Sequence, residues 1–498
     1  MNLLRPLAAL LVLSAPAAAQ VHYFPSGHPW SQQAGSGPDA VVPGWFYNLG
    51  ITGLRIELRE ERPKAMLVRF VFPGSAADGR VQPGEWVVGV DGQPFAEAHQ
   101  NGYGMSVFGA RGPVGELAPR LEAAQSAAGT GQLRLLVEDT TGAQREELLP
   151  VGQEYGAFSA TFPDACPKSE RLLDDLLDFL VQEQNAQGSW GNTVNNLFAT
   201  LALLSVHDSP ERRQALERSV QRMASTTSAT DTGGLINWRY MTAGIVLSEY
   251  HLATGASWVL PELEEVRDFL MASQYTRRSQ INPEAQNSHP HTFPDDLMDS
   301  HGGWGHNPGF EGYGPIGMIT GLGALSFSLM EHCGVAIDRE AHDFAYAFLA
   351  RGTGHNGYVW YKDEVAGHQN WADHGRTSAS ALANQLAPYP EARYRQRALK
   401  HLSVIAAHPE SFPDTHGSPQ LGMGLAVAAA SHDPATYRAL LDANRWWFAL
   451  AHCDDGTFVY QPNRDNAMYG GDSRVSASAV TAFMLASARR DLRVTGAR

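Results

Sequence analysis

The spacing of apolar residues changes along the stretch 172–206. Between residues 172 and 181 apolar side chains recur at helical spacing with aspartates between them, which predicts a helix with one buried face. The stretch 197–206 is apolar on nearly every side, which predicts a helix buried all round. Gly188 permits a tight exit from the first helix, and Trp190 covers the seam between the two. This pair predicts one outer and one inner wall.

The same hairpin pattern recurs six times between residues 165 and 490, with outer helices that begin at signals such as Ser209 followed by Pro210. The inner members are rich in Ala, Gly and Ser, which lets helices converge around a central cavity. We therefore predict a mainly α (α/α)6 toroid over 165–490. Further outer helices are expected from 261, 339, 390 and 433, and inner helices at 238–254, 314–330, 377–386, 417–430 and 473–488.

A smaller domain precedes the ring, at residues 44–152. Its short β-rich runs are punctuated by Pro-Gly, Asp-Gly and Thr-Gly turns, which predicts an α+β domain. The run Leu49-Gly-Ile-Thr-Gly53, the segment 83–92 and a helix at 117–125 resemble a PDZ domain, with Glu85 where Asp is usual. The chain is thus expected to be multi-domain, an N-terminal α+β PDZ-like domain followed by the toroid.

The PDZ resemblance implies a peptide C-terminus as a partner, because PDZ domains add an extended peptide to a strand and hold its carboxylate on backbone N–H groups. It assigns that role to Leu49, Gly50 and Gly53. The alternative is a domain docked on its neighbour with its groove empty, and the insertion 96–115 lies where it would cover the groove.

Residues 1–19 have the pattern of a secretory signal peptide. Arg5 precedes a short apolar core at 7–13, and Ala17 and Ala19 form a cleavage site before Gln20. Prolines bracket fewer than the roughly 20 apolar residues that a membrane span needs. We expect an exported protein, periplasmic or secreted, with an extension at 20–43 and no transmembrane segment.

The net charge of the 498 residues is −15 and the chain has no basic cluster, which argues against a nucleic-acid partner. The three cysteines, Cys166, Cys333 and Cys453, form no C-x-x-C pair, so a structural zinc site is not expected. One disulfide with a free thiol and three buried thiols both remain open.

The turns at 184–190 and 302–305 resemble the glutamine–tryptophan repeats of triterpene cyclases and their prenyltransferase relatives. That resemblance concerns the fold, since the Asp-x-Asp-Asp acid of the cyclases and the zinc set of the prenyltransferases are not found. The order of segments resembles a family of exported bacterial PDZ–toroid proteins of unknown function. It is carried by the signal, the PDZ-like run, Cys166-Pro-Lys-Ser169, Gly303-Trp-Gly305 and Asp414-Thr-His416-Gly417.

The loops that enter the inner helices gather His, Asp, Arg and aromatic residues at one mouth of the ring. Near a helix N-terminus His374 is expected to stay neutral as a base, while Arg376 would hold a carboxylate or a developing oxyanion. His416 would face them from the next inner helix. The candidate catalytic residues are Asp296, Asp299, His374, Arg376 and His416.

Carboxylate pairs, or His and Tyr bases with an Arg, suit glycan cleavage by hydrolysis or elimination. The leading hypothesis is an enzyme that cleaves a carbohydrate or cell-envelope polymer in the toroid cavity, with a glycan as partner. The alternative is a non-catalytic protein that captures a peptide in the PDZ groove and uses the toroid as a recognition scaffold. A metal site built from His301, His374 and His416 lacks tight ligand spacing, so none is assigned, and the cofactor question stays open.

Overall fold

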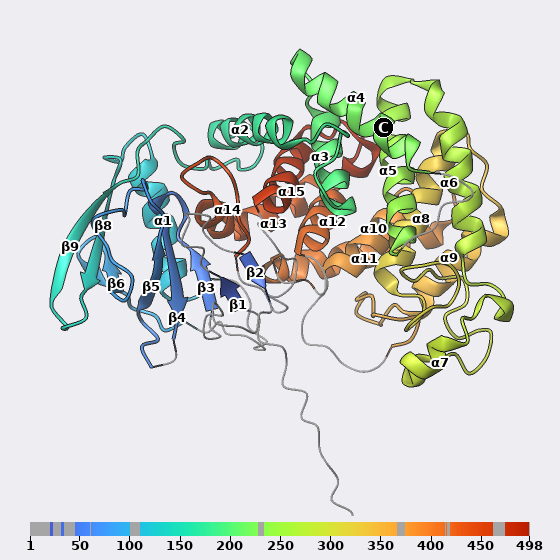
Figure 1. Ribbon diagram of the computed structural model, residues 1–498, viewed down its shortest axis with the longest axis horizontal. Helices are drawn as coiled ribbons and strands as arrows, with labels where there is room; N and C mark the ends of the chain where they lie inside the picture. Colours follow the sequence, from blue (N-terminus) through green and yellow to red (C-terminus); the bar gives the residue numbers. More distant parts are fainter. Residues whose placement is uncertain are drawn as a thin grey trace, which may run out of the picture.

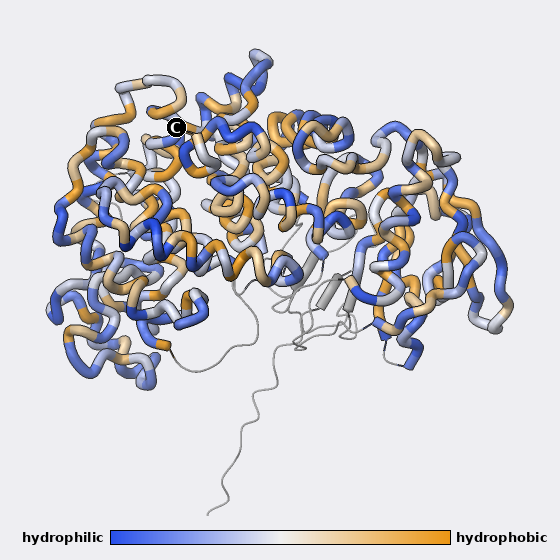
Figure 2. The backbone as a smooth tube through the Cα atoms, turned by 180° about the vertical axis from the view of Figure 1, so that it is seen from behind, coloured by the Kyte–Doolittle hydropathy of each residue, from blue (hydrophilic) through white to orange (hydrophobic). Residues whose placement is uncertain are grey.

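The computed structural model describes residues 20–22, 31–33, 45–59, 61–99, 110–227, 234–365, 374–413, 415, 419–461 and 474–497. A small β-sheet domain lies beside a larger helical body, and the helix α14 lies between them (Figure 1). Viewed from behind, apolar and polar positions alternate along the tube in both parts, so each part has its own buried side (Figure 2).

The small domain is an antiparallel sheet with one helix packed on it. Its strand order is β3-β4-β5-β6-β8-β9, with β7 paired to β6, and α1 (Pro113–Gln125) contacts β6 and β8. A two-stranded pair, β1 (Gln20–His22) with β2 (Ser31–Gln33), stands apart from it. The strands are β3 (Trp45–Asn48), β4 (Leu54–Leu58), β5 (Met66–Val71), β6 (Trp86–Val90), β7 (Gln93–Pro94), β8 (Gln132–Glu138) and β9 (Gln144–Pro150).

The helical body is a closed ring of helix pairs. Each inner helix contacts the next, and the last inner helix returns to the first. The inner helices are α3 (Thr193–Ser205), α5 (Ile236–Thr254), α8 (Gly317–His332), α10 (His374–Gln385), α12 (Pro419–Ser431) and α15 (Arg474–Ala486). The outer helices are α2 (Pro167–Glu183), α4 (Pro210–Ser225), α6 (Leu260–Ser273), α9 (Arg339–Arg351), α11 (Ala392–Ala407) and α13 (Pro434–Ala443).

Two short helices interrupt the alternation. α7 (Glu284–Ser288) belongs to the long insertion before α8, and α14 (Arg445–Ala451) follows α13. Single 3-10 turns occur between β3 and β4, in several connections of the ring and after α15. They are η1 (Gly50–Thr52), η2 (Ser257–Val259), η3 (Arg278–Gln280), η4 (Pro290–Thr292), η5 (Pro409–Ser411), η6 (Ser487–Arg489) and η7 (Arg493–Thr495).

The expected helix pairs are confirmed, with starts shifted by a few residues at α8, α10 and α12. The side chain of Ser209 accepts a hydrogen bond from Arg212 N at 3.1 Å, as an N-cap should. Outer helices such as α2 bury one stripe of leucines, whereas α8 is buried at every position from 317 to 330. All three cysteines are free thiols.

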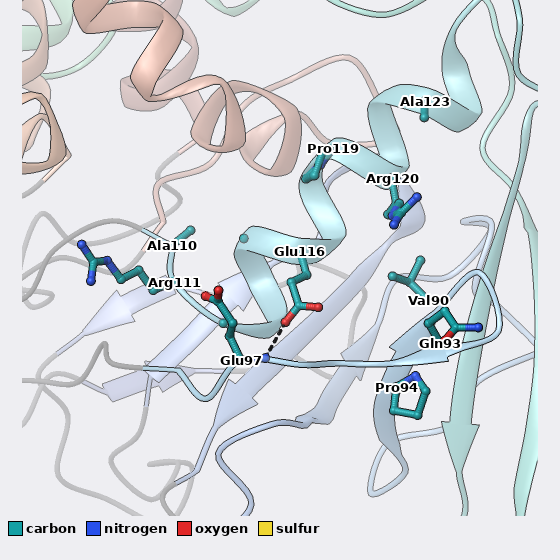
Figure 3. Close-up of a pocket in the computed structure, with 12 residues that line it drawn as sticks. Val90, Gln93, Pro94, Glu97, Ala110, Arg111, Glu116, Pro119, Arg120 and Ala123 are labelled. Atoms are coloured by element: carbon teal, nitrogen blue, oxygen red, sulfur yellow. Dashed lines mark hydrogen bonds between the residues drawn. The ribbon is translucent and has the colours of Figure 1, made fainter.

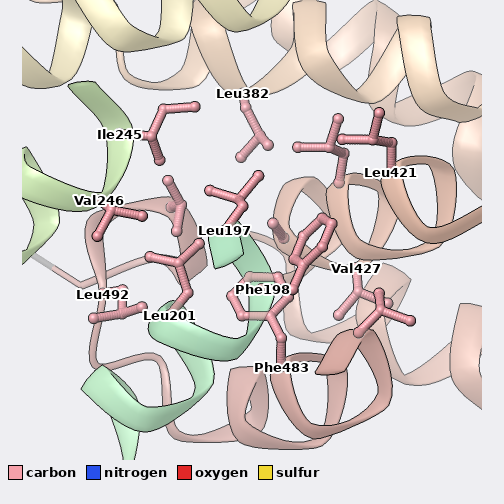
Figure 4. Close-up of a cluster of buried hydrophobic side chains, with 14 of the residues drawn as sticks. Leu197, Phe198, Leu201, Ile245, Val246, Leu382, Leu421, Val427, Phe483 and Leu492 are labelled. Carbon is pink, nitrogen blue, oxygen red and sulfur yellow. The ribbon is translucent and has the colours of Figure 1, made fainter. Parts of the chain in front are cut away.

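The centre of the ring differs from the cavity expected there. Leu197, Phe198, Leu421 and Phe483 converge from α3, α12 and α15, and Leu492 joins them from the C-terminal segment (Figure 4). These side chains are at most 3% exposed, so this level of the ring is apolar core. Polar chemistry is therefore confined to the ends of the ring.

The turn between α2 and α3 locks two neighbouring pairs together. Trp190 Nε1 donates to the carbonyl of Leu180 at 2.6 Å, which ties the turn to its own outer helix. Gln184 Nε2 donates to the carbonyl of Ala215 in the next outer helix at 2.8 Å. Gly188 has φ +77°, and a Cβ there would lie 2.5 Å from the carbonyl oxygen of Arg218. Only glycine permits this approach of two backbones.

The turn before α8 repeats the arrangement. Trp304 Nε1 donates to the carbonyl of Leu270 at 2.9 Å, and Gln274 Nε2 donates to the carbonyl of Ala341 at 3.0 Å. Gly302 has φ +85°, and its Cβ would lie 2.4 Å from the carbonyl oxygen of Phe344. The glutamine–tryptophan resemblance therefore describes a contact that joins successive helix pairs.

We predict that Gly188→Ala lowers the free energy of unfolding by about 2–4 kcal/mol, because it adds a steric clash to an unfavourable positive φ. The control is Gly191→Ala, which has φ +91° and open space around the Cβ position. It should cost only about 1 kcal/mol. Urea unfolding of the two variants measures the difference, and equal losses would contradict the proposed role of the close approach.

At the opposite end of the ring, α5 holds the C-terminal segment. The carboxylate of Glu249 accepts hydrogen bonds from Arg493 N at 3.0 Å and Val494 N at 2.7 Å. His432 Nε2 lies 3.2 Å from the carbonyl of Val494, on the other side of the same turn. Glu249 is 1% exposed, and this burial raises its pKa to about 7.

This raised pKa makes the folded state lose stability as pH rises. In the unfolded chain the pKa of Glu249 is near the usual glutamate value of 4.5, whereas in the folded protein it is about 7. Its contribution is therefore fully present below the unfolded pKa and is lost between the two values, an effect on the order of 3 kcal/mol. We predict that Glu249→Gln gains melting temperature relative to the wild type between about pH 5 and pH 8. Glu217→Gln, at an exposed position of α4, should track the wild type throughout. Parallel curves for wild type and Glu249→Gln would contradict the assignment.

Candidate functional site

The inner helices begin at one end of the ring, which we call the mouth. Asn237 at the start of α5 donates to the carbonyl of Gly305, in the loop before α8, at 2.8 Å. Gly317 N donates to the carbonyl of Tyr361, in the loop before α10, at 2.7 Å. Hydrogen bonds therefore link the starts of neighbouring inner helices, so side chains from several loops meet here.

A hydrogen-bonded row of three side chains lies at the mouth. Trp238, in the first turn of α5, donates from Nε1 to His306 Nδ1 at 2.8 Å. His306 Nε2 makes a short hydrogen bond with the hydroxyl of Tyr313. The rings of Trp238 and His306 are stacked, with centroids 5.9 Å apart. All three side chains are half-buried, so they are held in place and still reach solvent.

The row fixes the proton on His306. Burial lowers the pKa of His306, which keeps the ring neutral at neutral pH. Because Nδ1 accepts the Trp238 N–H, the single proton of the neutral ring is on Nε2, which donates to the oxygen of Tyr313. The hydroxyl proton of Tyr313 is then directed to a further acceptor. This is the arrangement of a tyrosine prepared to give up a proton.

Aromatic rings and an arginine continue the row toward α10. The rings of Tyr313 and Tyr361 have centroids 5.9 Å apart. The guanidinium carbon of Arg376 lies 5.5 Å from the centroid of Tyr361 and 5.4 Å from that of Tyr358, and Arg376 donates a short hydrogen bond to the Tyr358 hydroxyl. Arg376 therefore orients two tyrosines of the loop before α10.

An ion pair fastens the insertion before α8 to this loop. Arg351 NH2 lies 2.7 Å from Asp363 Oδ2 and donates to the carbonyl of His301 at 2.7 Å. Asp363 also accepts from Ser300 N at 3.0 Å. The segment that carries His306 and Tyr313 is thus held against the segment that carries Tyr361.

Only part of the sequence-predicted site is assembled here. His374 and Arg376 lie at the start of α10, with exposures of 0% and 6%. Asp296 and Asp299 are exposed, and the hydrogen bonds that they accept come from backbone N–H groups of their own loop, at 2.6–3.4 Å. They shape a turn of the insertion. His416 lies outside the described residues.

The sequence predicts aromatic residues at the mouth, but Tyr313, Tyr358 and Tyr361 are not among its named candidates. The signal that points to them is an aromatic residue next to glycine in a loop entering an inner helix. Gly312 precedes Tyr313, and Gly357 precedes Tyr358. Among the described residues, no group of three or more His, Cys, Asp or Glu side chains is placed to hold a metal ion.

A surface hollow of the small domain lies away from the mouth. It has a volume of about 640 Å³ and lies between α1 and β6–β7 (Figure 3). Glu116 on its wall already accepts from the backbone N–H groups of Ala96 and Glu97, at 2.9–3.1 Å. Glu116, one of two glutamates that line the hollow, therefore serves the domain's own loop.

The structure is that of an α/α toroid with a small antiparallel sheet domain and a polar, aromatic mouth. The chain belongs to the family described as Domain of unknown function (DUF6288), which matches residues 169–496. No curated protein matches the chain. No helix among the described residues is long and apolar enough to cross a membrane.

The chain is similar to several solved structures at low identity. An inactive variant of the α-1,6-mannanase GH76A of Salegentibacter sp. HEL1_6, in complex with α-1,6-mannotriose, is 12% identical, with 64% of this chain and 99% of that chain covered and a TM-score of 0.44. A variant of the type II terpene cyclase MstE from Scytonema is 13% identical, with 64% and 97% covered and a TM-score of 0.41. A glycosyl hydrolase family 88 protein from Bacteroides vulgatus is 11% identical, with 65% and 99% covered and a TM-score of 0.41. At these values the likeness concerns the arrangement of helices, and no chemistry is transferred from it.

The state of His306 is open to a direct test. Trp238→Phe removes an N–H donor that only the neutral imidazole accepts, so we predict that the pKa of His306 rises by up to about one unit. Trp258→Phe is the control, since Trp258 is 46% exposed and lies on η2, outside the row. Titration of the histidine ring signals by NMR gives the two values. An unchanged pKa in Trp238→Phe would contradict the proton assignment.

Proposed function

We propose that the protein is an exported enzyme that cleaves a carbohydrate polymer at the mouth of the ring. The observation that carries this proposal is the row Trp238–His306–Tyr313, in which a neutral histidine orients a tyrosine hydroxyl at a partly open surface. Export rests on the signal-like residues 1–19.

The chemistry starts at the hydroxyl of Tyr313. This group gives its proton to the leaving glycosidic oxygen while the C–O bond breaks, and the phenolate that forms is stabilised by the Nε2–H of His306. In hydrolysis, water supplies the hydroxyl for the sugar carbon and the proton that restores Tyr313. In elimination, a base takes the proton from the carbon next to the one that loses the leaving oxygen, the electron pair forms the double bond, and exchange with solvent returns a proton to Tyr313 and removes one from the base. Both routes share the protonation step.

The other rings of the mouth suit binding of a sugar chain. Trp238 and Tyr361 are half-buried and lie on either side of Tyr313, which suits stacking on the apolar faces of successive sugar units. Arg376 keeps Tyr361 in position, and His374 lies two residues before it on α10. We retain His374 and Arg376 as site residues in this proposal, whereas the exposed turn residues Asp296 and Asp299 are given no catalytic role.

The rival hypothesis, a recognition scaffold that captures a peptide terminus at residues 49–53, has no observation in its favour. Binding of a polymer without cleavage would instead support a recognition role for the mouth.

Cleavage is tested on a panel of neutral and acidic polysaccharides. Reducing ends report hydrolysis, and an unsaturated product reports elimination. We predict that Tyr313→Phe lowers kcat by about 10²–10⁴-fold with little change in melting temperature, because only the proton donor is removed. Tyr250→Phe, on the same inner helix as Trp238 but near its far end, should retain full activity. The proposal would be overturned if Tyr313→Phe cleaved a polymer at the wild-type rate, or if the wild type cleaved no polymer of the panel.

A further inference from the structure

The strand that would receive a peptide in the small domain is already paired along both sides. On one side, β3 pairs with β4 from Trp45 opposite Leu58 to Asn48 opposite Arg55. On the other side, β4 pairs with β5. Capture of an extended peptide as an added strand requires an open edge. The chain's own β3 takes that edge of β4.

The loop next to this strand is packed against the ring. Gly50, which the PDZ resemblance assigns to carboxylate binding, approaches α14 so closely that a Cβ on it would lie 2.5 Å from the carbonyl oxygen of Ala449. Leu450 of α14 is fully buried within the apolar core of the small domain. The ring of Trp446 lies 6.2 Å from that of Tyr47. α14 therefore closes the apolar core of the small domain.

A reciprocal pair of hydrogen bonds joins the two parts at the end of β3. Asn48 N donates to the side-chain Oε1 of Gln461 at 3.0 Å, and Gln461 Nε2 donates back to the carbonyl of Asn48 at 3.1 Å. These are the two backbone groups that a neighbouring strand would otherwise take. The side chain of Asn48 also donates to the carbonyl of Leu450 at 2.8 Å. Asn48 and Gln461 are each 1% exposed, so water does not compete for these bonds.

A second polar contact joins the domains at the start of α2. Lys168 is 1% exposed, and its ammonium makes a short ion pair with Glu122 of α1 and donates to Gln125 Oε1 at 3.2 Å. Glu122 also accepts from Phe158 N at 2.7 Å. Because the ammonium is buried where it meets α1, this contact requires the two parts to stay packed together.

The segment that ends at Gln461 leads to the start of α15. Within it, Phe458 N donates to Ser478 Oγ at 3.0 Å, and Thr457 Oγ1 accepts from Arg474 at 2.8 Å. At the same level Ser476 Oγ donates to Asn195 Oδ1, at the start of α3, at 2.8 Å. One segment thus has the small domain at one end and the mouth of the ring at the other.

We propose that the small domain is a fixed brace for the ring, with α14 packed against the loop Leu49–Gly53. In this arrangement Asn48 and Gln461 set the position of the first turn of α15. Asn48 and Gln461 are positioning residues in this proposal. They act on the mouth through the segment 452–461 and do not touch a substrate. The proposal does not depend on the chemistry proposed for the mouth.

Amide hydrogen exchange of the full-length protein tests the brace without any substrate. Gln461→Ala removes both bonds to Asn48, so we expect exchange at residues 452–461 and 474–478 to become about tenfold faster or more. Gln461→Asn keeps an amide on a side chain one methylene shorter, so it should show a smaller increase. Gln214→Ala, the same change at an exposed position of α4, should exchange as the wild type does.

A binding measurement completes the test. The wild type is titrated with a pool of fluorescent decapeptides that end in an apolar residue and a free carboxylate, and we expect no binding. Micromolar binding that is lost on amidation of the peptides would show an open receptor site and overturn the proposal. Unchanged exchange at 474–478 in Gln461→Ala would also overturn it. If Gln461→Ala does not fold, exchange in Gln461→Asn and the peptide titration decide the question.

Discussion

The ring depends on the approach of a glycine backbone to the backbone of the next outer helix. At Gly188 and Gly302 the chain turns with positive φ and leaves no room for a Cβ between the turn and the neighbouring helix. The indoles of Trp190 and Trp304 then donate to carbonyls in the last turns of α2 and α6, which fixes each turn on its own helix. These contacts set the step between neighbouring helix pairs at two places in the ring, whose inner helices contact one another in a closed circle.

Ring closure decides where chemistry is available. Apolar side chains of the inner helices converge at the centre, and the hydrogen-bonded row of the mouth lies where these helices begin. There, Trp238, His306 and Tyr313 come from α5 and from the insertion, and their hydrogen bonds dictate which nitrogen of the imidazole carries the proton. The Arg351–Asp363 ion pair holds the insertion against the loop before α10, so these side chains are positioned before any ligand binds.

The small domain is packed firmly against the ring. Leu450 of the ring completes its core, and a glutamine side chain takes the place of a strand at the end of β3. The PDZ resemblance implies a domain that binds peptides, whereas we propose that this domain supports the ring. Residues 1–19 and His416 lie outside the described part of the chain, so export and the role of His416 rest on sequence alone.

The sequence by itself determined the helix pairs, their caps and the antiparallel domain in front of them, because hydrophobic period, proline, glycine and Ser209-type caps act over a few neighbouring residues. It also singled out Arg376 and His374 as residues at the start of an inner helix. Only the tertiary structure decided that Asp296 and Asp299 shape an exposed turn, that Tyr313 meets His306, and that Leu450 lies in the core of the other domain. Those outcomes depend on side chains far apart in the sequence, and no local pattern records which of them come into contact.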